Sequence, residues 1–331
     1  MTDPRLDVLC IGNAIVDVIA GADDAFLAAE GLDKGAMRLI DAEEATRLYG
    51  RMGPGREISG GSAGNTAAGL AMLGARAGFV GQVADDQLGE VYRHDIQSIG
   101  IEFTTPPLSG REPTARCLVL VTPDAQRTMN TFLGAAQLLT VDALDEDQVR
   151  RSAIVYLEGY LWDPEAPRAA MERAIDVAHD AGNKVAFTLS DSFCVDRHRD
   201  SFNALIDSGR LDILFANEAE ILSLTGAASF EDAVAATAKR VPLLVVTRSE
   251  KGAVAVSDDE HAQVPAEPVG EVVDTTGAGD LFAAGFLAGL SQQRPLRDCL
   301  RIGAIAAAEV ISHYGARPEA DLKALVAEKL G

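Results

Sequence analysis

The chain has 331 residues, of which 47% are hydrophobic and 24% are charged, so it can bury a large core and does not have the composition of a disordered protein. Its 29 basic and 50 acidic residues give a formal net charge of −21, and no basic run reverses this locally, which argues against nucleic acid or an anionic membrane as a partner. The N-terminus lacks a secretory signal and no apolar run approaches ~18 residues, so we expect a cytoplasmic protein without a membrane span.

Short apolar runs alternate with alanine-rich helical patterns along most of the chain. Buried strands are predicted at residues 6–12, 77–81, 153–159, 184–190, 211–217 and 242–247. Between two of them, residues 167–182 form an amphipathic helical pattern that ends at Gly182. This alternation predicts βαβ units and therefore an α/β fold with an open, mostly parallel sheet flanked by helices.

Two parts of the chain show strand patterns without intervening helices. Residues 14–20 and 34–41 are predicted strands, and residues 113–134 are a predicted hairpin that turns at Pro123 and Asp124. Because these segments lack intervening helices, we expect them to form a small second β-sheet over the main domain. A lid of this kind excludes water from transfer reactions. The expected large domain comprises residues 1–12, 43–103 and 135–331, and the expected lid comprises residues 13–42 and 104–134.

Polar residues follow several of the predicted strands in succession. Ser190 and Asp191 follow one strand, Asn217 and Glu220 follow the next, and Thr247 closes another. Each position alone could simply cap a strand or start a helix. Because ligands of open parallel sheets bind beyond the carboxyl ends of the strands, the succession favours a ligand site there.

The segment EVVDTTGAGDLFAAGFLAGL (271–290) has the strongest functional pattern. A strand is predicted to end at Asp274, a glycine-rich turn follows, and an apolar helix begins near Asp280. The glycines let amide groups converge and the helix N-terminus adds partial positive charge, which together make an anion-binding site. Asp280 is then either a favourable first-turn carboxylate or a base that accepts the proton of a substrate hydroxyl during phosphoryl transfer.

The segment ISGGSAGNTAAGLAMLGA (58–75) is a second glycine-rich entry to a predicted helix. Gly60 and Gly61 would allow close approach of a ligand, and Asn65 offers both donors and acceptors. The alternative is a structural entry to an alanine-rich core helix.

The segment GNAIVDV (12–18) is predicted to be extended. With a period of two, Asn13, Ile15 and Asp17 share one face, where polar groups could bind sugar hydroxyls. An exposed edge face is the competing interpretation.

Together these motifs resemble the PfkB, or ribokinase-like, family of carbohydrate and nucleoside kinases. DTTGAGD (274–280) is similar to its C-terminal signature, GGSAGNTA (60–67) with GFVGQVADDQLGE (78–90) to its N-terminal signature, and ANEAE (216–220) to its Asn-x-x-Glu element. The resemblance spans residues 6 to 320 and implies a ribokinase-like fold. It also implies ATP with Mg²⁺ as cofactors and a nucleoside or sugar as the acceptor of the γ-phosphoryl group.

The resemblance assigns roles to individual residues. It implies that Asp280 is the base and that the anion hole is formed by the amides of Gly277, Ala278 and Gly279. The implied substrate contacts are Asn13, Asp17, Gly60, Gly61 and Asn65.

Nucleotide and cation contacts follow from the same resemblance. Asn217 and Glu220 would organise Mg²⁺ and phosphates, mainly through water. The segment VTRSEKGA (246–253) is similar to the nucleotide loop, with Thr247 and Gly252 kept and Ser249 where glycine is usual. Asp274 and Thr276 match positions at which family members often bind a monovalent cation such as K⁺.

Within the family, residues 12–18, 273–290 and 299–318 are similar to adenosine kinases. Arg127 stands where those kinases carry an arginine near the transferred phosphate, and the base pocket would use Leu133, Tyr160 and Leu161. We therefore expect the enzyme to phosphorylate adenosine on its 5′-hydroxyl. We expect the enzyme itself to be a monomer or a homodimer. The alternative is a sugar kinase acting on a fructose-like or ribose-like substrate.

Two functions from other classes compete with the kinase. GGSAG (60–64) matches the G-x-S-x-G nucleophile elbow, which would make Ser62 a hydrolase nucleophile with His261 or His313 as base. The elbow should follow a buried apolar strand, whereas residues 51–59 are polar and turn-like. A non-catalytic nucleotide or sugar sensor is the other alternative, but a sensor would not need the carboxylate of Asp280.

Overall fold

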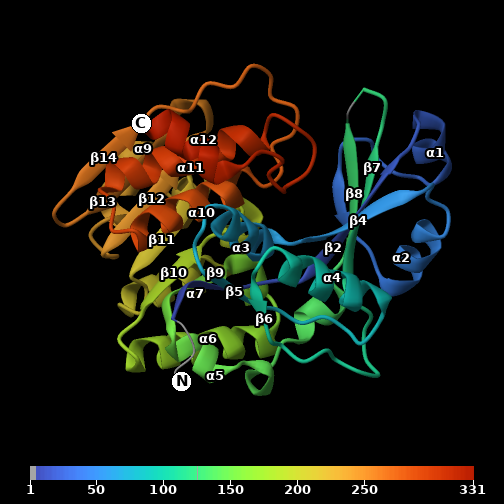
Figure 1. Cartoon of the computed structure of the whole chain (residues 1–331), viewed down its shortest axis with the longest axis horizontal. Coiled ribbons are helices and arrows are strands. Elements are labelled where there is room, and N and C mark those ends of the chain that lie inside the picture. The colour runs from blue at the N-terminus through green and yellow to red at the C-terminus, as the bar shows by residue number, and fades with distance from the viewer. Residues whose placement is uncertain (1–4, 125) are drawn as a thin grey trace.

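The computed structural model describes residues 5–124 and 126–331; residues 1–4 and 125, which fall in the expected domain ranges and hairpin, lie outside the described residues. The larger of two sheets has the strand order β14-β13-β12-β11-β10-β9-β1-β5-β6 (Figure 1). Its strands are β1 (Leu6–Ile11), β5 (Ala77–Val80), β6 (Glu102–Phe103), β9 (Ser152–Glu158), β10 (Lys184–Thr188), β11 (Ile213–Asn217), β12 (Leu243–Thr247), β13 (Ala253–Ser257) and β14 (His261–Val264). All neighbours pair in parallel except β13 and β14, which form an antiparallel edge, so the predicted open, mostly parallel sheet is confirmed.

Helices cover both faces of this sheet because its buried strands point alternate apolar side chains to opposite sides. Val8 and Tyr156 belong to one hydrophobic cluster, whereas Leu9 and Val155 belong to the other. The first cluster is completed by α3 (Ser62–Met72), α4 (Gln87–Ser98), α10 (Ala278–Ser291), α11 (Leu296–Val310) and α12 (Leu322–Leu330). The second is completed by α5 (Glu146–Arg150), α6 (Glu165–Asp180), α7 (Ser192–Asp207), α8 (Glu218–Thr225) and α9 (Phe230–Thr237). Short 3₁₀ turns are η1 (Gly134–Leu138), η2 (Val141–Ala143), η3 (Gly159–Trp162) and η4 (Ser249–Lys251).

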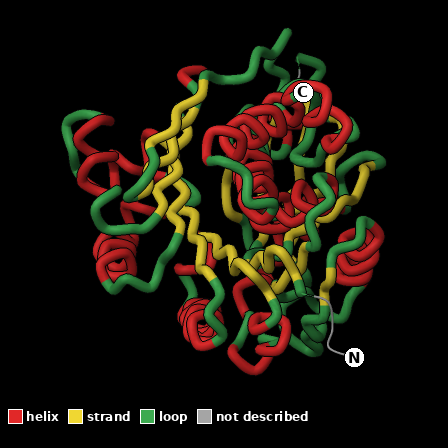
Figure 2. Tube along the Cα trace, turned by 60° about the vertical axis from the view of Figure 1, so that its left-hand side comes forward, coloured by secondary structure: helices red, strands yellow, loops and turns green. Residues whose placement is uncertain are grey.

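The predicted second sheet is also present, with the strand order β3-β8-β7-β2-β4. It consists of β2 (Ile15–Gly21), β3 (Met37–Leu39), β4 (Gly55–Gly60), β7 (Ala115–Val121) and β8 (Arg127–Phe132). Val16 and Val18 are buried on one face, in the same cluster as residues of α1 (Asp24–Ala29) and α2 (Ala42–Tyr49). Figures 1 and 2 show these two helices on the outer side of the small sheet, whose strands lie between them and the main body.

Three local predictions differ from the structure. Residues 55–60 form β4, which the polar composition of residues 51–59 did not indicate, because an edge strand needs few apolar side chains and β2 supplies its hydrogen-bond partners. This strand lies in the small sheet although we expected residues 43–103 in the large domain; the remaining domain bounds stay a prediction. Residues 271–274 are not a strand, and Val273 is instead held by a hydrogen bond from its amide to the Ile311 carbonyl at 2.8 Å.

No helix within the described ranges is long and apolar enough to cross a membrane. The four cysteines are buried and unpaired.

Candidate active site

The carboxyl ends of the parallel strands bring the predicted polar residues to one edge of the sheet. Asn217 ends β11 directly opposite Thr247 at the end of β12. Glu158 ends β9 opposite Thr188 of β10, and Asn13 follows β1. Of these residues, Asn217 and Thr247 were predicted to follow strands, whereas Glu158 was not. The helices α3 and α10 begin on the same side, where Ser62 of α3 donates to Asp280 of α10.

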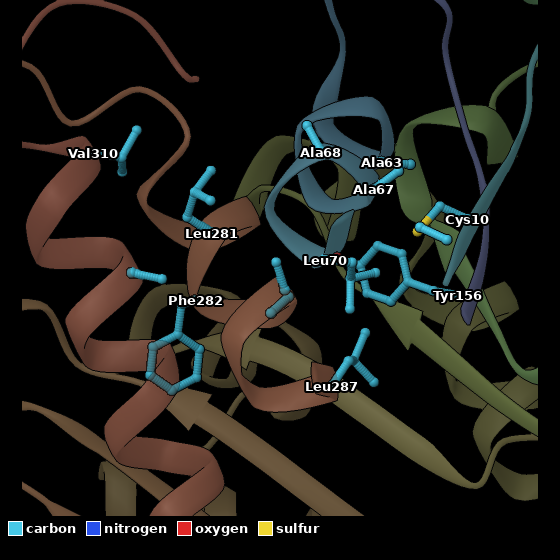
Figure 3. Packing of buried hydrophobic residues seen from close by; sticks show 14 of the residues in the cluster. Cys10, Ala63, Ala67, Ala68, Leu70, Tyr156, Leu281, Phe282, Leu287 and Val310 are labelled. Atoms are coloured by element: carbon cyan, nitrogen blue, oxygen red, sulfur yellow. The ribbon is translucent and has the colours of Figure 1, made fainter. Parts of the chain in front are cut away.

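Close packing of α3 against α10 sets the geometry of the site. Gly69 of α3 makes it possible, because a Cβ atom there would lie 2.6 Å from Leu281 Cδ1 and 2.7 Å from Ala284 Cβ of α10. Figure 3 shows side chains of both helices, among them Ala67 and Leu281, within one buried cluster. The first turns of the two helices consequently meet, and each carries a polar group.

Asp280 lies in the first turn of α10 and is held by two side chains of α3. Ser62 Oγ donates to Asp280 Oδ1 at 2.6 Å, and Asn65 Nδ2 donates to Oδ2 at 2.9 Å. Burial raises the pKa of Asp280 to about 6, against the lowering effect of these two hydrogen bonds and of Arg317. The carboxylate is therefore mostly ionised at neutral pH, as a proton acceptor must be.

This arrangement does not provide a hydrolase nucleophile. Ser62 donates its hydroxyl to a carboxylate, and His313 Nε2 instead lies 3.2 Å from Glu309 Oε1. His261 begins β14, the antiparallel edge strand of the large sheet.

The glycine-rich turn before α10 presents free amides. Gly277 has a φ of +79°, in the left-handed region that favours glycine, and caps the helix. The Ala278 amide donates to the Thr275 carbonyl at 3.2 Å, whereas the amides of Gly277 and Gly279 have no hydrogen-bond acceptor within the described ranges. Two of the three amides predicted for the anion hole are thus available to a ligand.

Glu158 is buried and forms hydrogen bonds to two segments of the site, at Asn13 and at Ala63. Its Oε1 accepts from the backbone amide and side-chain Nδ2 of Asn13 at 2.7 and 2.6 Å, and its Oε2 accepts from the Ala63 amide at 2.8 Å. Burial raises the pKa of Glu158 to about 7, although three N–H donors favour the ionised form. Glu158 was absent from the predicted site, yet a charged residue that ends an otherwise apolar strand was a usable signal.

Asp17 of β2 faces the glycine pair at the end of β4. A side chain at Gly60 would overlap the Asp17 carboxylate, and one at Gly61, whose φ is +83°, would overlap the Asn13 carbonyl. Burial raises the pKa of Asp17 to about 6, while Arg317 and Arg127 lower it and Asp280 raises it further. The structure thus brings the small sheet, α3 and α10 to one place.

Several buried polar atoms of this site have no partner in the part of the chain that the structure describes. They are Asn13 Oδ1, Asn65 Oδ1, and Nε and Nη2 of Arg127. An unsatisfied buried polar group costs about 1–3 kcal/mol, so such atoms point to an absent ligand. Two acceptors suit hydroxyl groups, and a guanidinium suits an anion.

Arg127 and Asp274 form an ion pair at 2.7 Å, with both side chains largely buried. Asp274 Oδ1 also accepts from the amide and hydroxyl of Thr276 at 3.1 and 2.7 Å, and Oδ2 accepts from the Gly315 amide at 3.0 Å. The two side chains expected at a monovalent cation are therefore bonded to each other here, and the K⁺ site stays a prediction.

Asn217 and Glu220 form a capping box at the start of α8. Asn217 Oδ1 accepts from the Glu220 amide at 2.9 Å, and the Glu220 carboxylate accepts from the amide and side chain of Asn217 at 2.9 and 2.6 Å. No group of three or more His, Cys, Asp or Glu side chains that could hold a metal occurs among the described residues. This donor set fits only a Mg²⁺ ion that keeps its own waters, as Mg²⁺ usually does.

The turn after β12 contains the three residues predicted for the nucleotide loop. Thr247 ends the strand, and Ser249 has a φ of 51°, which explains why glycine would be usual at its position. At Gly252, with a φ of +89°, a side chain would overlap the Val264 carbonyl.

The proposed base-pocket residues are not equally placed. Leu133 and Tyr160 are half-buried, and the Tyr160 hydroxyl lies 3.3 Å from the Ser190 carbonyl. Leu161 is fully buried in the second hydrophobic cluster, so contact with a substrate would require its neighbours to move.

A carboxylate held between two helix N-termini, next to free amides and a guanidinium with two unpartnered nitrogens, defines a phosphotransferase that acts on hydroxyl groups. Residues 7–322 match the model of the pfkB family carbohydrate kinases, and the chain belongs to this family.

Three similar proteins are named as kinases of different acceptors. The adenosine kinase from Sinorhizobium meliloti is 50% identical, with a TM-score of 0.90 over 99% of this chain and 100% of that one. A "probable sugar kinase protein" from Rhizobium etli CFN 42 is 48% identical, with a TM-score of 0.90 over 98% of this chain and 99% of that one. Fructokinase-1 from Zea mays is 30% identical over 234 residues, which cover 69% of this chain and 72% of that protein.

Proposed function

We propose that this chain transfers the γ-phosphoryl group of ATP to the 5′-hydroxyl of adenosine, giving AMP and ADP. The observation that carries the proposal is the hydrogen bond from the Ser62 hydroxyl to Asp280 Oδ1 at 2.6 Å. It supports Asp280 as a base, because a hydroxyl group already donates to this carboxylate within the reach that proton transfer requires.

In the proposed reaction, Asp280 orients the acceptor hydroxyl and accepts its proton as the new O–P bond forms. The free amides of Gly277 and Gly279, at the positive end of α10, stabilise charge on the transferred group. The unpaired N–H groups of Arg127 add to this stabilisation. Bound Mg²⁺ would neutralise phosphate charge, with Asn217 and Glu220 contacting its water ligands.

The ribose would be bound by groups of both sheets' edges. Asp17 and the unpartnered oxygens of Asn13 and Asn65 are acceptors, and vicinal hydroxyls are matching donors. Held in this way, the sugar presents its primary hydroxyl to Asp280, whose Oδ2 accepts a hydrogen bond from Asn65 Nδ2.

Preference for adenosine over a bare sugar must come from the base. The adenosine kinase at 50% identity supports a nucleoside, and the half-buried Leu133 and Tyr160 are candidate walls for its ring. Stacking a base is worth about 1–3 kcal/mol, which corresponds to a preference of ~10–100-fold.

A sugar kinase is the second candidate. The relative from Rhizobium etli, called a probable sugar kinase, is almost equally similar at 48% identity. The hydroxyl-binding groups Asp17, Asn13 and Asn65 would serve fructose or ribose as well as a nucleoside.

Acceptor-dependent ADP release tests the proposal. Purified enzyme with ATP and Mg²⁺ is given adenosine, ribose, fructose or 5′-deoxyadenosine, which lacks only the acceptor hydroxyl. We expect fast release with adenosine, little with the sugars, and none with 5′-deoxyadenosine, which should instead inhibit competitively. Faster turnover of fructose or ribose than of adenosine would show that the acceptor is a sugar. If no acceptor stimulates ADP release, the proposed kinase activity is wrong.

A further inference from the structure

Residues 315–317 connect the two glycine-rich elements of the site. The Gly315 amide donates to Asp274 Oδ2 at 3.0 Å. Ala316 packs so closely on the turn before α10 that a Cβ atom at Gly277 would lie 2.8 Å from the Ala316 Cβ. The next residue, Arg317, reaches the other element, at the junction of β4 and α3.

Arg317 binds that junction through every N–H-bearing nitrogen of its guanidinium. Nε and Nη2 donate to the Ser59 carbonyl at 2.9 and 2.7 Å, and Nη2 also donates to Ser59 Oγ at 2.8 Å. Nη1 donates to the Gly64 carbonyl at 2.9 Å. These bonds fix the backbone on both sides of Gly60 to Ala63, where α3 begins, and therefore fix the position of Ser62 and Asn65.

All of these acceptors are neutral, so the charge of Arg317 has no direct carboxylate partner in the described part of the chain. Asp95 of α4 lies one step away, because Ser59 N and Oγ donate to Asp95 Oδ2 at 2.8 and 2.5 Å. The titratable groups that face Arg317 are Tyr92 and Asp95 of α4, Asp17 of β2 and Asp280 of α10. Two of these carboxylates are the proposed base and the proposed ribose-binding group.

Asp17 and Asp280 repel each other when both are ionised. Burial raises the pKa of each to about 6, and the interaction with Arg317 acts in the opposite direction on both. Arg127 also faces Asp17, and Glu158, Tyr156 and Tyr160 sense the charge of Asp280. Arg317 is the cation that acts on both carboxylates.

We propose that Arg317 is a positioning residue of the phosphoryl-transfer site, which holds the start of α3 against the turn before α10 and balances the charges of Asp17 and Asp280. The proposal rests on the proposed function for its catalytic part. Its electrostatic part concerns the folded protein alone and can be measured without turnover.

The first test measures stability in the full chain. Arg317→Met removes the charge and keeps the length of the side chain, Arg317→Lys keeps the charge, and Arg297→Met, exposed on α11, is the matched control. Because Asp17 and Asp280 are ionised at pH 8 but largely protonated at pH 5, Arg317→Met should lower the folding equilibrium constant ~10-fold more at pH 8 than at pH 5. Arg317→Lys and Arg297→Met should show no such difference. An equal loss at both pH values for Arg317→Met would overturn the charge balance, whether or not the enzyme is a kinase.

The second test measures the pH profile of kcat/KM with the acceptor that wild-type enzyme uses. Without Arg317 the pKa of the base rises, so the acid limb of Arg317→Met should move to higher pH by about one unit, a ~5-fold extra loss at pH 6. Arg317→Lys should keep the acid limb of the wild-type pH profile. Its kcat/KM should be lower by the same factor at all pH values, because lysine cannot form the hydrogen bonds of the guanidinium to Ser59 and Gly64. An unshifted limb in Arg317→Met would refute the proposal, whereas absence of any acceptor-dependent rate in wild type would refute the proposed function and leave the stability test to decide.

Discussion

At the scale of single residues, Ser249 stores backbone strain in the predicted nucleotide loop. Its φ of 51° lies in the left-handed region, where a side chain costs roughly 1–2 kcal/mol and a β-branched one costs more. We expect Ser249→Gly to be neutral or to stabilise by up to ~1 kcal/mol, and Ser249→Val to destabilise by at least about 1 kcal/mol. Urea unfolding midpoints would measure both. Equal stability of the glycine and valine variants would contradict the left-handed conformation.

Some residues of the site could be predicted from the sequence and others could not. Asp280 and Asn65 could be anticipated to lie in one site because each belongs to a glycine-rich start of an apolar helix. Arg317 could not, because its partners Ser59 and Gly64 are 258 and 253 residues away along the chain. A single polar residue in a loop carries no pattern that predicts such a distant contact.

At the scale of elements, the capping box of α8 separates a structural from a metal-related role of Glu220. Glu220→Gln removes the charge but keeps an acceptor for the Asn217 amide, so stability should change little. If Glu220 acts on Mg²⁺ through water, this variant should need several-fold more Mg²⁺ for half-maximal rate. Glu220→Ala, the control, should also lose about 1 kcal/mol of stability. If the Mg²⁺ dependence of Glu220→Gln is unchanged, the role of Glu220 is limited to capping α8.

Elements were predictable from sequence where burial imposes a pattern. The parallel strands are apolar on both faces, so runs such as residues 153–159 identify them directly. The strand β4 was not predicted, and residues 271–274 were predicted as a strand but do not form one, for opposite reasons. The first is a polar edge strand, and the second is an apolar segment whose Val272 is exposed and whose amides bond to a helix end.

At the scale of the whole molecule, four carboxyl groups make stability depend on pH; Glu158 and Glu220 are buried, and Asp17 and Asp280 are partly buried. Burial raises the pKa of Asp17 and Asp280 to about 6 and that of Glu158 and Glu220 to about 7. An acid with a raised folded-state pKa binds its proton more tightly in the folded state, so stability falls as pH rises from the unfolded value, about 4, through the folded value. Surface carboxyls beside arginine, such as Glu44 and Glu218, have lowered pKa values and act only at lower pH.

We therefore expect the free energy of unfolding to fall by a few kcal/mol between pH 5 and pH 7.5, in line with ~2–3 kcal/mol for one strongly shifted carboxyl. The net charge of −21 acts in the same direction. Urea unfolding at several pH values measures the fall, and Glu158→Gln should make it shallower. Stability that rises over this range would show that these carboxyl groups are not buried as described.

The rate of adenosine phosphorylation by Asp280→Asn tests the central claim most directly. Asparagine keeps the shape of the side chain but cannot accept the hydroxyl proton, so AMP formation should fall by ~10²-fold or more while ATP binding, measured by calorimetry, is retained. Ser62→Ala is the matched control, because it removes one hydrogen bond to the carboxylate and leaves the base; it should keep substantial activity at pH 8, where Asp280 remains ionised. Near-normal AMP formation by Asp280→Asn would contradict the account.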